Sequence, residues 1–163
     1  MRYKFSKMKK IFLVLLIAFG SLIVSAQETA EWQTDLTKAI ALSNKNHKPL
    51  FLFFTGSDWC GWCMKLQKEV FKTPEFTKWA KDNVILVELD FPKRTPQSDE
   101  LKQQNGQLNN FFKVRGYPTV WITDVVKTAE GKIQFAPRGS SGYVAGGPSA
   151  WLEGANKIMV NKT

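Results

Sequence analysis

The two cysteines of the chain, Cys60 and Cys63, stand three positions apart and closely follow an apolar run, Leu50–Phe54. The run predicts a buried strand, and Gly56 begins the turn that leads to the cysteines. Residues three apart on a helix are neighbours, and a disulfide needs Cα atoms about 4.4–6.8 Å apart. A cysteine at a helix start has its thiolate stabilised by free N–H groups and the helix dipole. The spacing therefore predicts a redox-active pair, because the thiolate is the form that attacks disulfides.

Two other uses of the cysteines fit the sequence less well. A structural zinc site takes four protein ligands, and two cysteines with the single histidine, His47, cannot supply them without carboxylates or a second chain. A purely structural disulfide across so small a loop would remove little chain entropy, since its stabilisation grows with loop length. We therefore expect no metal and no organic cofactor, because the Cys60–Cys63 disulfide is itself the redox group.

The first 26 residues have the pattern of a secretory signal peptide. A basic start precedes the apolar run Ile11–Val24, which leads into Ser25 and Ala26 with small side chains near the cleavage point. Cleavage after Ala26 would make the mature protein periplasmic or secreted, in a compartment where disulfides form and persist. The apolar run is shorter than the roughly 20 residues of a membrane span. If it were not cleaved, it would instead anchor the protein to the membrane.

The positive charge of the chain lies largely in this leader. The formal net charge is +9, and more than half of it comes from Arg2, Lys4, Lys7, Lys9 and Lys10. The other charges are interspersed and form no arginine-rich block, so we expect no nucleic-acid partner. Residues 27–163 have a length typical of one domain with a single core. Neither length nor charge decides the oligomeric state.

Helix and strand patterns alternate along residues 27–163 and predict an α/β fold with a mixed sheet. The expected elements, in chain order, are a helix over 31–46, a strand over 50–55, helices over 60–72 and 75–82, a strand over 84–91, a helix over 99–114, hairpin strands at 119–123 and 132–136, a Gly- and Ser-rich loop over 138–147, and a last helix from Pro148. Between the helices over 60–72 and 75–82, Thr73 is expected to be a helix cap, with Pro74 in the first helical position.

Two motifs give the chain a resemblance to the thioredoxin superfamily, over about residues 49–159. They are Trp59-Cys60-Gly61-Trp62-Cys63 after a buried strand and Gly116-Tyr117-Pro118-Thr119 before the hairpin. Asp58-Trp59-Cys60 and Phe71-Lys72-Thr73-Pro74 make it similar to exported members such as the C-terminal domain of the membrane thiol:disulfide reductase DsbD. The resemblance implies a thioredoxin-like three-layer sandwich, with helices on both faces of the sheet, and a thiol-disulfide oxidoreductase of the bacterial cell envelope.

The resemblance also implies a role for the residues of the two motifs. Cys60 is expected to be the attacking thiol and Cys63 the resolving thiol. Pro118 is expected to follow a cis peptide bond, which would turn the Tyr117 backbone toward an extended substrate. Trp59 fits a docking surface and a core position equally well. The expected substrate-binding residues come from both motifs: Trp59, Gly61, Trp62, Tyr117 and Pro118.

The chain departs from the family pattern beside the cysteines. Typical thioredoxins have a buried Asp six positions before the first cysteine, and here that position is Phe54. The lysine usually paired with this acid is replaced as well, with Leu86 at the aligned position. Losing both is physically coherent, because a lone buried charge is costly. The proton of Cys63 must then pass to water or to one of three candidate carboxylates: Asp58, Glu69 and Glu88.

The dipeptide between the cysteines favours one direction of the reaction over the other. Gly-Trp does not resemble the Pro-His dipeptide of strong oxidants, so we expect a reductase or isomerase that exchanges disulfides with proteins and takes electrons from a membrane partner. Two other functions stay open. One is a thioredoxin-like binding or chaperone module without redox turnover, and the other is a subunit of an envelope complex docked through the loop over 138–147.

Overall fold

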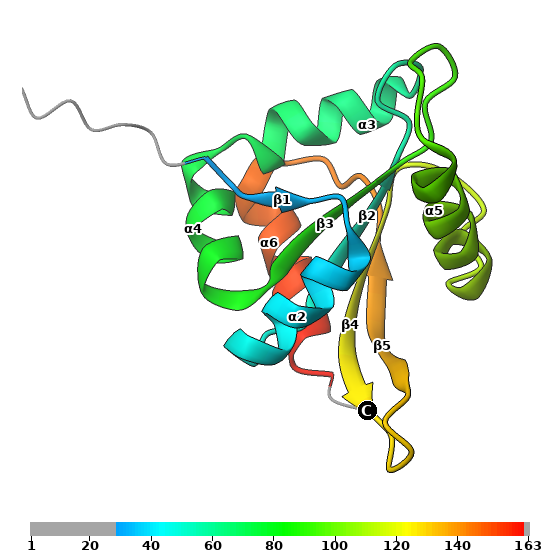
Figure 1. Cartoon of the computed structure of the whole chain (residues 1–163). Helices are drawn as coiled ribbons and strands as arrows, with labels where there is room; N and C mark the ends of the chain where they lie inside the picture. Colours follow the sequence, from blue (N-terminus) through cyan, green and yellow to red (C-terminus); the bar gives the residue numbers. More distant parts are fainter. Residues whose placement is uncertain (1–28, 162–163) are drawn as a thin grey trace, which may run out of the picture.

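The computed structural model describes residues 29–161, so the predicted signal peptide over residues 1–26 lies outside the described part of the chain. Within that part, a five-stranded mixed sheet has the order β1-β3-β2-β4-β5 (Figure 1). The first three strands in this order run parallel, and the last two are antiparallel to their neighbours. Their bounds are Trp32–Gln33 for β1, Ile85–Asp90 for β3, Leu50–Thr55 for β2, Thr119–Lys127 for β4 and Ile133–Ser141 for β5.

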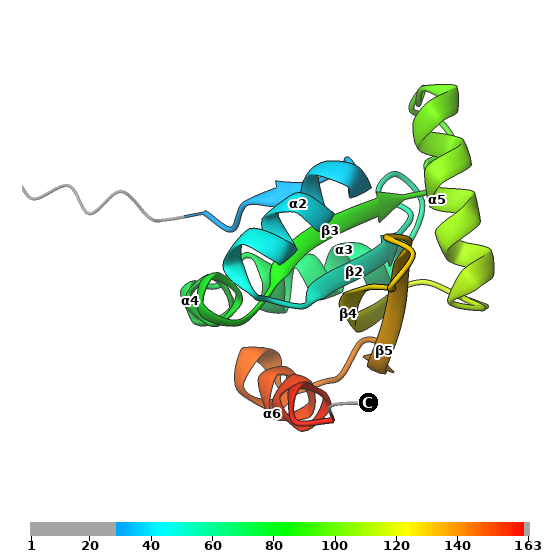
Figure 2. The same cartoon turned by 60° about the horizontal axis from the view of Figure 1, so that its bottom comes forward.

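Helices cover both faces of this sheet (Figures 1 and 2). One face carries α2 (Leu36–Asn46) and α5 (Asp99–Phe111). The other carries α3 (Gly61–Leu66), the π-helix η1 (Gln67–Phe71), α4 (Pro74–Asn83) and α6 (Gly147–Met159). The thioredoxin-like three-layer sandwich predicted from the sequence is therefore confirmed.

The central strand β2 divides the core into two halves. All six of its residues are buried. Phe51 and Phe53 join the cluster under α3, α4 and α6, whereas Leu52 and Phe54 join the cluster under α2 and α5. Full burial of one such side chain stabilises the fold by about 1.5–3 kcal/mol. The unbroken apolar run is thus explained by helices on both faces.

The predicted N-terminal helix over 31–46 ends where expected but begins too early. Trp32 and Gln33 instead pair with β3, and the helix starts at Leu36 after Asp35, whose carboxylate accepts hydrogen bonds from two backbone N–H groups of the first turn. Trp32 and Leu36 match helical spacing, but they pack on opposite faces of the sheet. Edge pairing and the Asp35 cap outweigh the helical pattern.

The predicted helix over 60–72 is also divided. It is α-helical only over α3, and η1 then closes wider turns, with the Lys72 N–H donating to the Gln67 carbonyl at 2.9 Å. The adjacent Val70 and Phe71 are both buried. The next helix begins as predicted, with Thr73 as its cap and Pro74 in its first turn.

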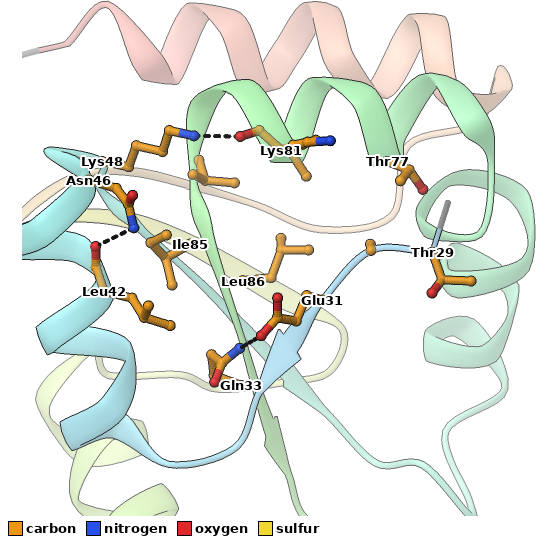
Figure 3. A pocket seen from close by; sticks show the side chains of 13 residues that line it. Thr29, Glu31, Gln33, Leu42, Asn46, Lys48, Thr77, Lys81, Ile85 and Leu86 are labelled. Carbon is orange, nitrogen blue, oxygen red and sulfur yellow. Dashed lines mark hydrogen bonds between the residues drawn. The ribbon is translucent and has the colours of Figure 1, made fainter. Parts of the chain in front are cut away.

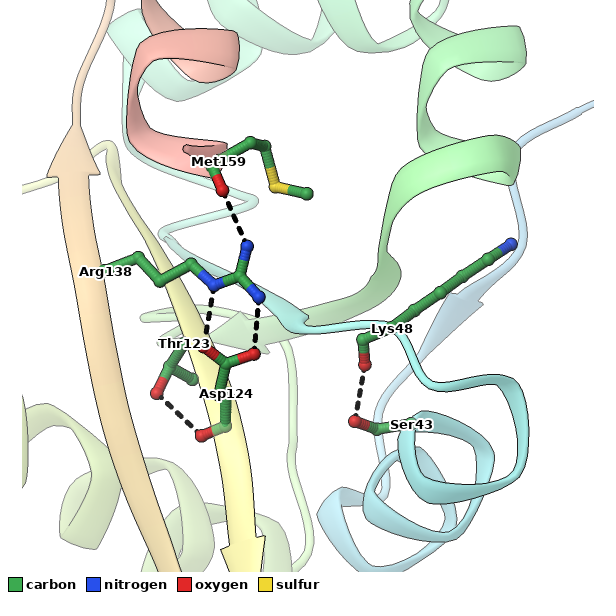
Figure 4. Close-up of polar contacts among 6 residues, drawn as sticks. All are labelled: Ser43, Lys48, Thr123, Asp124, Arg138 and Met159. Carbon is green, nitrogen blue, oxygen red and sulfur yellow. Dashed lines mark hydrogen bonds and ion pairs between the residues drawn. The ribbon is translucent and has the colours of Figure 1, made fainter. Parts of the chain in front are cut away.

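The predicted loop over 138–147 is wrong in its first part, because residues 138–141 continue β5. Arg138 is the extra residue of a bulge between Pro137 and Gly139. Its guanidinium forms two hydrogen bonds to the Asp124 carboxylate, at 2.6 and 2.7 Å, and one to the Met159 carbonyl at the end of α6 (Figure 4). Arg138 therefore joins the hairpin to α6, and this removes it from any docking loop.

Candidate active site

The two cysteines lie at the start of α3, after the turn that follows β2. The Cys60 N–H donates to the Gly56 carbonyl at 2.9 Å, which closes the turn. Cys60 is the N-cap of α3, and its Sγ accepts a hydrogen bond from the Cys63 N–H at 3.2 Å. The two residues form a disulfide with Cα atoms 5.2 Å apart. The same N–H group would stabilise a Cys60 thiolate in the reduced form.

The two cysteine residues are both buried, but they differ in exposure. Cys60 is 6 % exposed, whereas Cys63 is fully buried in the cluster that contains Leu66 and Val120. Cys60, which keeps some exposure at the edge of the site, can be reached by a second disulfide, whereas Cys63 is shielded from it. This asymmetry suits Cys60 to attack and Cys63 to resolve.

The second sequence motif lies beside the first because β2 and β4 are neighbours, with Phe54 opposite Thr119. The Tyr117–Pro118 peptide is cis, as the resemblance implied. The Tyr117 ring meets the Trp59 ring edge to face at 5.8 Å and stacks on Phe91. Trp59 and Tyr117, both named from the sequence, are therefore brought together.

Trp59 is 39 % exposed, so it is neither a core residue nor a free one. Its ring lies against Gly56, where a Cβ atom would be only 2.4 Å from the ring, and its Nε1–H donates to the Phe91 carbonyl at 2.8 Å. The Lys93 ammonium lies 4.0 Å from the centre of the ring. Only glycine at position 56 lets the indole lie this close to the turn.

Trp62 lies on the other side of Cys60 in the chain and is 57 % exposed. Its ring packs against Tyr143 at 5.0 Å, and the Lys65 ammonium lies 5.1 Å from both ring centres. The Tyr143 hydroxyl donates to Glu69 at 2.7 Å, which raises the pKa of Tyr143. Nothing in the sequence links Tyr143 to the cysteines, because it enters from the loop after β5.

Asp58 is a clamp for the loop after β3. Its carboxylate accepts hydrogen bonds from the N–H groups of Lys93 at 3.0 Å, Arg94 at 2.7 Å and Thr95 at 2.8 Å. The Arg94 guanidinium also donates to the Asp58 carbonyl. The Lys93 N–H, with the other two, holds the pKa of Asp58 well below its ordinary value. A carboxylate held this way is a weak proton acceptor.

The register of β2 and β3 separates the two residues expected at the positions of the usual acid and lysine, Phe54 and Leu86. Phe54 faces α2 and α5 and pairs with Leu89, while Leu86 pairs with Phe51 on the opposite face. Phe54 and Leu86 therefore do not face each other. Glu88 pairs with Phe53 and lies on the face that carries the cysteines. Burial, with the nearby Asp90 charge, raises the pKa of Glu88.

Of the cavities in the described part of the chain, two are lined by residues of both β3 and α4. One, of about 460 Å³, is lined by Glu88, Phe53 and Gln67, and Gln67 lies one helical turn beyond Cys63. The other, of about 290 Å³, lies between the end of α2, β1 and α4 (Figure 3). It borders the start of β3, at the end of the sheet away from the cysteines, so it is not part of the site.

Over residues 29–161, no three His, Cys, Asp or Glu side chains gather as a metal site would need. The same stretch has no helix that is both long and apolar enough to cross a membrane.

Asp58→Asn is expected to lower the urea midpoint of unfolding at neutral pH, because an amide nitrogen cannot accept the loop N–H groups. Since the pKa of Asp58 is lowered by folding, its stabilisation is complete above the unfolded value of about 3.9 and is lost as the pH falls below it. The gap between wild type and variant should therefore shrink below about pH 4. Asp82→Asn, on exposed α4 surface, is the control. Equal midpoints for wild type and Asp58→Asn at neutral pH would contradict the clamp.

Comparison with known proteins agrees with this geometry. A family model described as a thioredoxin-like domain matches residues 36–139. The disulfide bond reductase DsbH of Chlamydia pneumoniae is 36 % identical over 120 residues, which cover 74 % of this chain and 72 % of DsbH. The thioredoxin-related protein DsbJ of the same organism is 34 % identical over 117 residues, 69 % of this chain but only 34 % of DsbJ.

A solved structure of DsbH oxidoreductase superposes with a TM-score of 0.71 at 33 % identity and covers 83 % of this chain and 88 % of that one. The matched family region contains β2, the cysteines and the cis-proline turn. The predicted membership of the thioredoxin superfamily is thus confirmed. The chain belongs to the family of thioredoxin-like domains.

Proposed function

We propose that this protein is a thiol-disulfide oxidoreductase that reduces disulfides in protein substrates. The observation that carries the proposal is the cysteine pair itself. Cys60 is the N-cap of α3 and keeps some exposure, and the fully buried Cys63 forms a disulfide with it. Membership of the thioredoxin-like family and the similarity to a protein named disulfide bond reductase support the same reaction.

The reaction begins with the reduced protein. The Cys60 thiolate attacks one sulfur of the substrate disulfide, and the other substrate sulfur leaves as a thiolate and takes up a proton. Cys63 then loses its proton and attacks Cys60 Sγ in the mixed disulfide, which releases the second substrate thiolate. The substrate gains two electrons, and the protein becomes the disulfide form that the structure contains. A donor dithiol restores the reduced form, and no organic cofactor takes part.

The substrate is held as an extended segment beside the cis-proline turn. Backbone groups of Tyr117 pair with the segment, and Pro118 faces the disulfide. Trp62, more than half exposed, gives the segment an apolar surface to lie on, with Trp59 and the Gly61 backbone beside Cys60. These roles rest on the position of the residues around the cysteines.

Among the three candidate carboxylates, we assign Glu88 as the proton acceptor for Cys63. Asp58 is engaged by three backbone N–H groups, and Glu69 is held at the rim by Tyr143 and Lys65. Glu88 lies on the cysteine face of β3, beside the cavity that reaches Gln67. Its raised pKa makes it a stronger base than an exposed carboxylate.

The proposed setting is the bacterial cell envelope. The leader pattern over residues 1–26 would export the protein, and a membrane partner would then supply electrons. Either a periplasmic or a secreted location follows from cleavage after Ala26, and a membrane-anchored one follows if the leader stays. The similarity to a disulfide bond reductase favours the reducing direction.

Cys63→Ala is expected to trap substrates as mixed disulfides on Cys60, because nothing resolves the first bond. The adducts should appear on non-reducing gels of an envelope extract and disappear with dithiothreitol. Cys60→Ala is the matched control and should trap far less, since Cys63 is fully buried. If Cys63→Ala carried no adduct while Cys60→Ala did, the assigned roles would be reversed. No adduct on either would favour a binding module without turnover.

Glu88→Gln is expected to slow release of the mixed disulfide at least about tenfold at neutral pH, since general-base assistance to Cys63 is lost. The rates should converge as the pH approaches the thiol pKa of about 8.5, where Cys63 ionises unaided. The measurement is stopped-flow release of a fluorescent peptide thiol across pH. Glu69→Gln is the control, and an unchanged profile for Glu88→Gln would remove Glu88 from the mechanism.

The Glu88→Gln substitution should also change the free energy of unfolding. A carboxyl whose pKa is raised by folding adds stability below its unfolded pKa of about 4.3 that is lost as the pH rises through its folded pKa. Glu88→Gln should therefore be more stable than wild type at pH 7, and the difference should vanish below about pH 4.

A further inference from the structure

Two lysine–tryptophan pairs flank the reactive sulfur. Lys93 lies over the Trp59 ring at 4.0 Å, and Lys65 lies 5.1 Å from the Trp62 ring. Trp59 immediately precedes Cys60 and contacts Tyr117, whereas Trp62 follows it and contacts Tyr143. The two pairs therefore have different neighbours, and their tryptophans precede and follow Cys60 in the chain. We call them the Lys93–Trp59 pair and the Lys65–Trp62 pair.

The acidic groups near these lysines are already engaged. The Asp58 carboxylate accepts from the backbone of the loop that carries Lys93, and not from its ammonium. Glu69 accepts the Tyr143 hydroxyl and lies 3.9 Å from Lys65, a separation at the limit of an ion pair. No ion pair of Lys93 is found among residues 29–161.

Further positive charge stands near both motifs. Arg94 follows Lys93 and is tied to the Asp58 carbonyl, and Arg115 lies exposed two residues before Tyr117. The surface around the disulfide thus presents two ammonium groups over aromatic rings, with two guanidinium groups on neighbouring segments. The Asp58, Glu69 and Asp90 carboxylates beside it are held by hydrogen bonds to the protein itself. Such a surface attracts side chains that combine an apolar stem with a negative end.

We propose that the preferred substrates are extended segments with Asp or Glu on both sides of the reacting cysteine. This inference rests on the proposed function and names its substrate class. A segment laid beside Tyr117 would place one flanking carboxylate at the Lys93–Trp59 pair and the other at the Lys65–Trp62 pair. Rim charges of this kind act mainly on association rate and partner choice, and they weaken with salt.

The test uses two peptides of one sequence, each with a single disulfide, in which the residues flanking the cysteines are either Glu or Lys. The reduced full-length protein reacts with each, and the second-order rate constant is divided by that for dithiothreitol on the same peptide. This division removes the intrinsic difference in disulfide reactivity. The Glu peptide should react about fivefold faster at low ionic strength, and the preference should fade in 1 M salt, where the Debye length is about 3 Å.

The double variant Lys65→Gln with Lys93→Gln should reduce the preference to about one, and replacement of both lysines by Arg should keep it. Lys132→Gln is the matched control, because it removes a lysine from the β4–β5 turn at the far end of the molecule (Figure 1). Two outcomes would overturn this inference. One is equal rate constants for the two peptides after division by the dithiothreitol values, and the other is a preference that survives in the double Gln variant. Failure to reduce either peptide would overturn the proposed function, and this inference with it.

Discussion

The reactivity of Cys60 depends on its position at the first turn of α3, and that position depends on β2. The strand is buried on both faces, which fixes its register against β3 and β4 and so fixes where the chain leaves the sheet. The turn at Gly56 then delivers Cys60 to the helix start, where a backbone N–H points at its sulfur. The cis-proline turn is brought to the same place by β4. Sheet register thus sets the geometry of the site.

The core of this arrangement could be predicted from the sequence because its signals are local. The apolar run of β2, the cysteine spacing, and the cap formed by Thr73 with Pro74 each appear within a few residues. The prediction of a helix at Trp32 is wrong, because the spacing of Trp32 and Leu36 is helical whereas edge pairing with β3 decides the conformation of Trp32. The prediction of a loop at Arg138 is also wrong. Gly and Ser around Arg138 suggest a loop, whereas its contact with Asp124 extends the strand.

Part of the site depends on contacts between distant segments, and no sequence pattern marks these. Tyr143 reaches Trp62 from the loop after β5, and Lys93 reaches Trp59 because Asp58 clamps the loop after β3. The face on which Glu88 lies follows only from the register of β2 and β3, in which Glu88 pairs with Phe53 and Leu86 pairs with Phe51. These contacts give the proposed acid–base group and the charged rim, and both are consequences of packing.

The most direct test of the account is the reduction potential of the Cys60–Cys63 couple, measured in a glutathione buffer series on residues 27–163. A reductant that donates electrons to substrate disulfides predicts a value near about −270 mV, as in thioredoxin. A value near about −120 mV would make the couple an oxidant and contradict the proposed direction. If the couple could not be oxidised and reduced reversibly, this result would contradict the proposed enzymatic function.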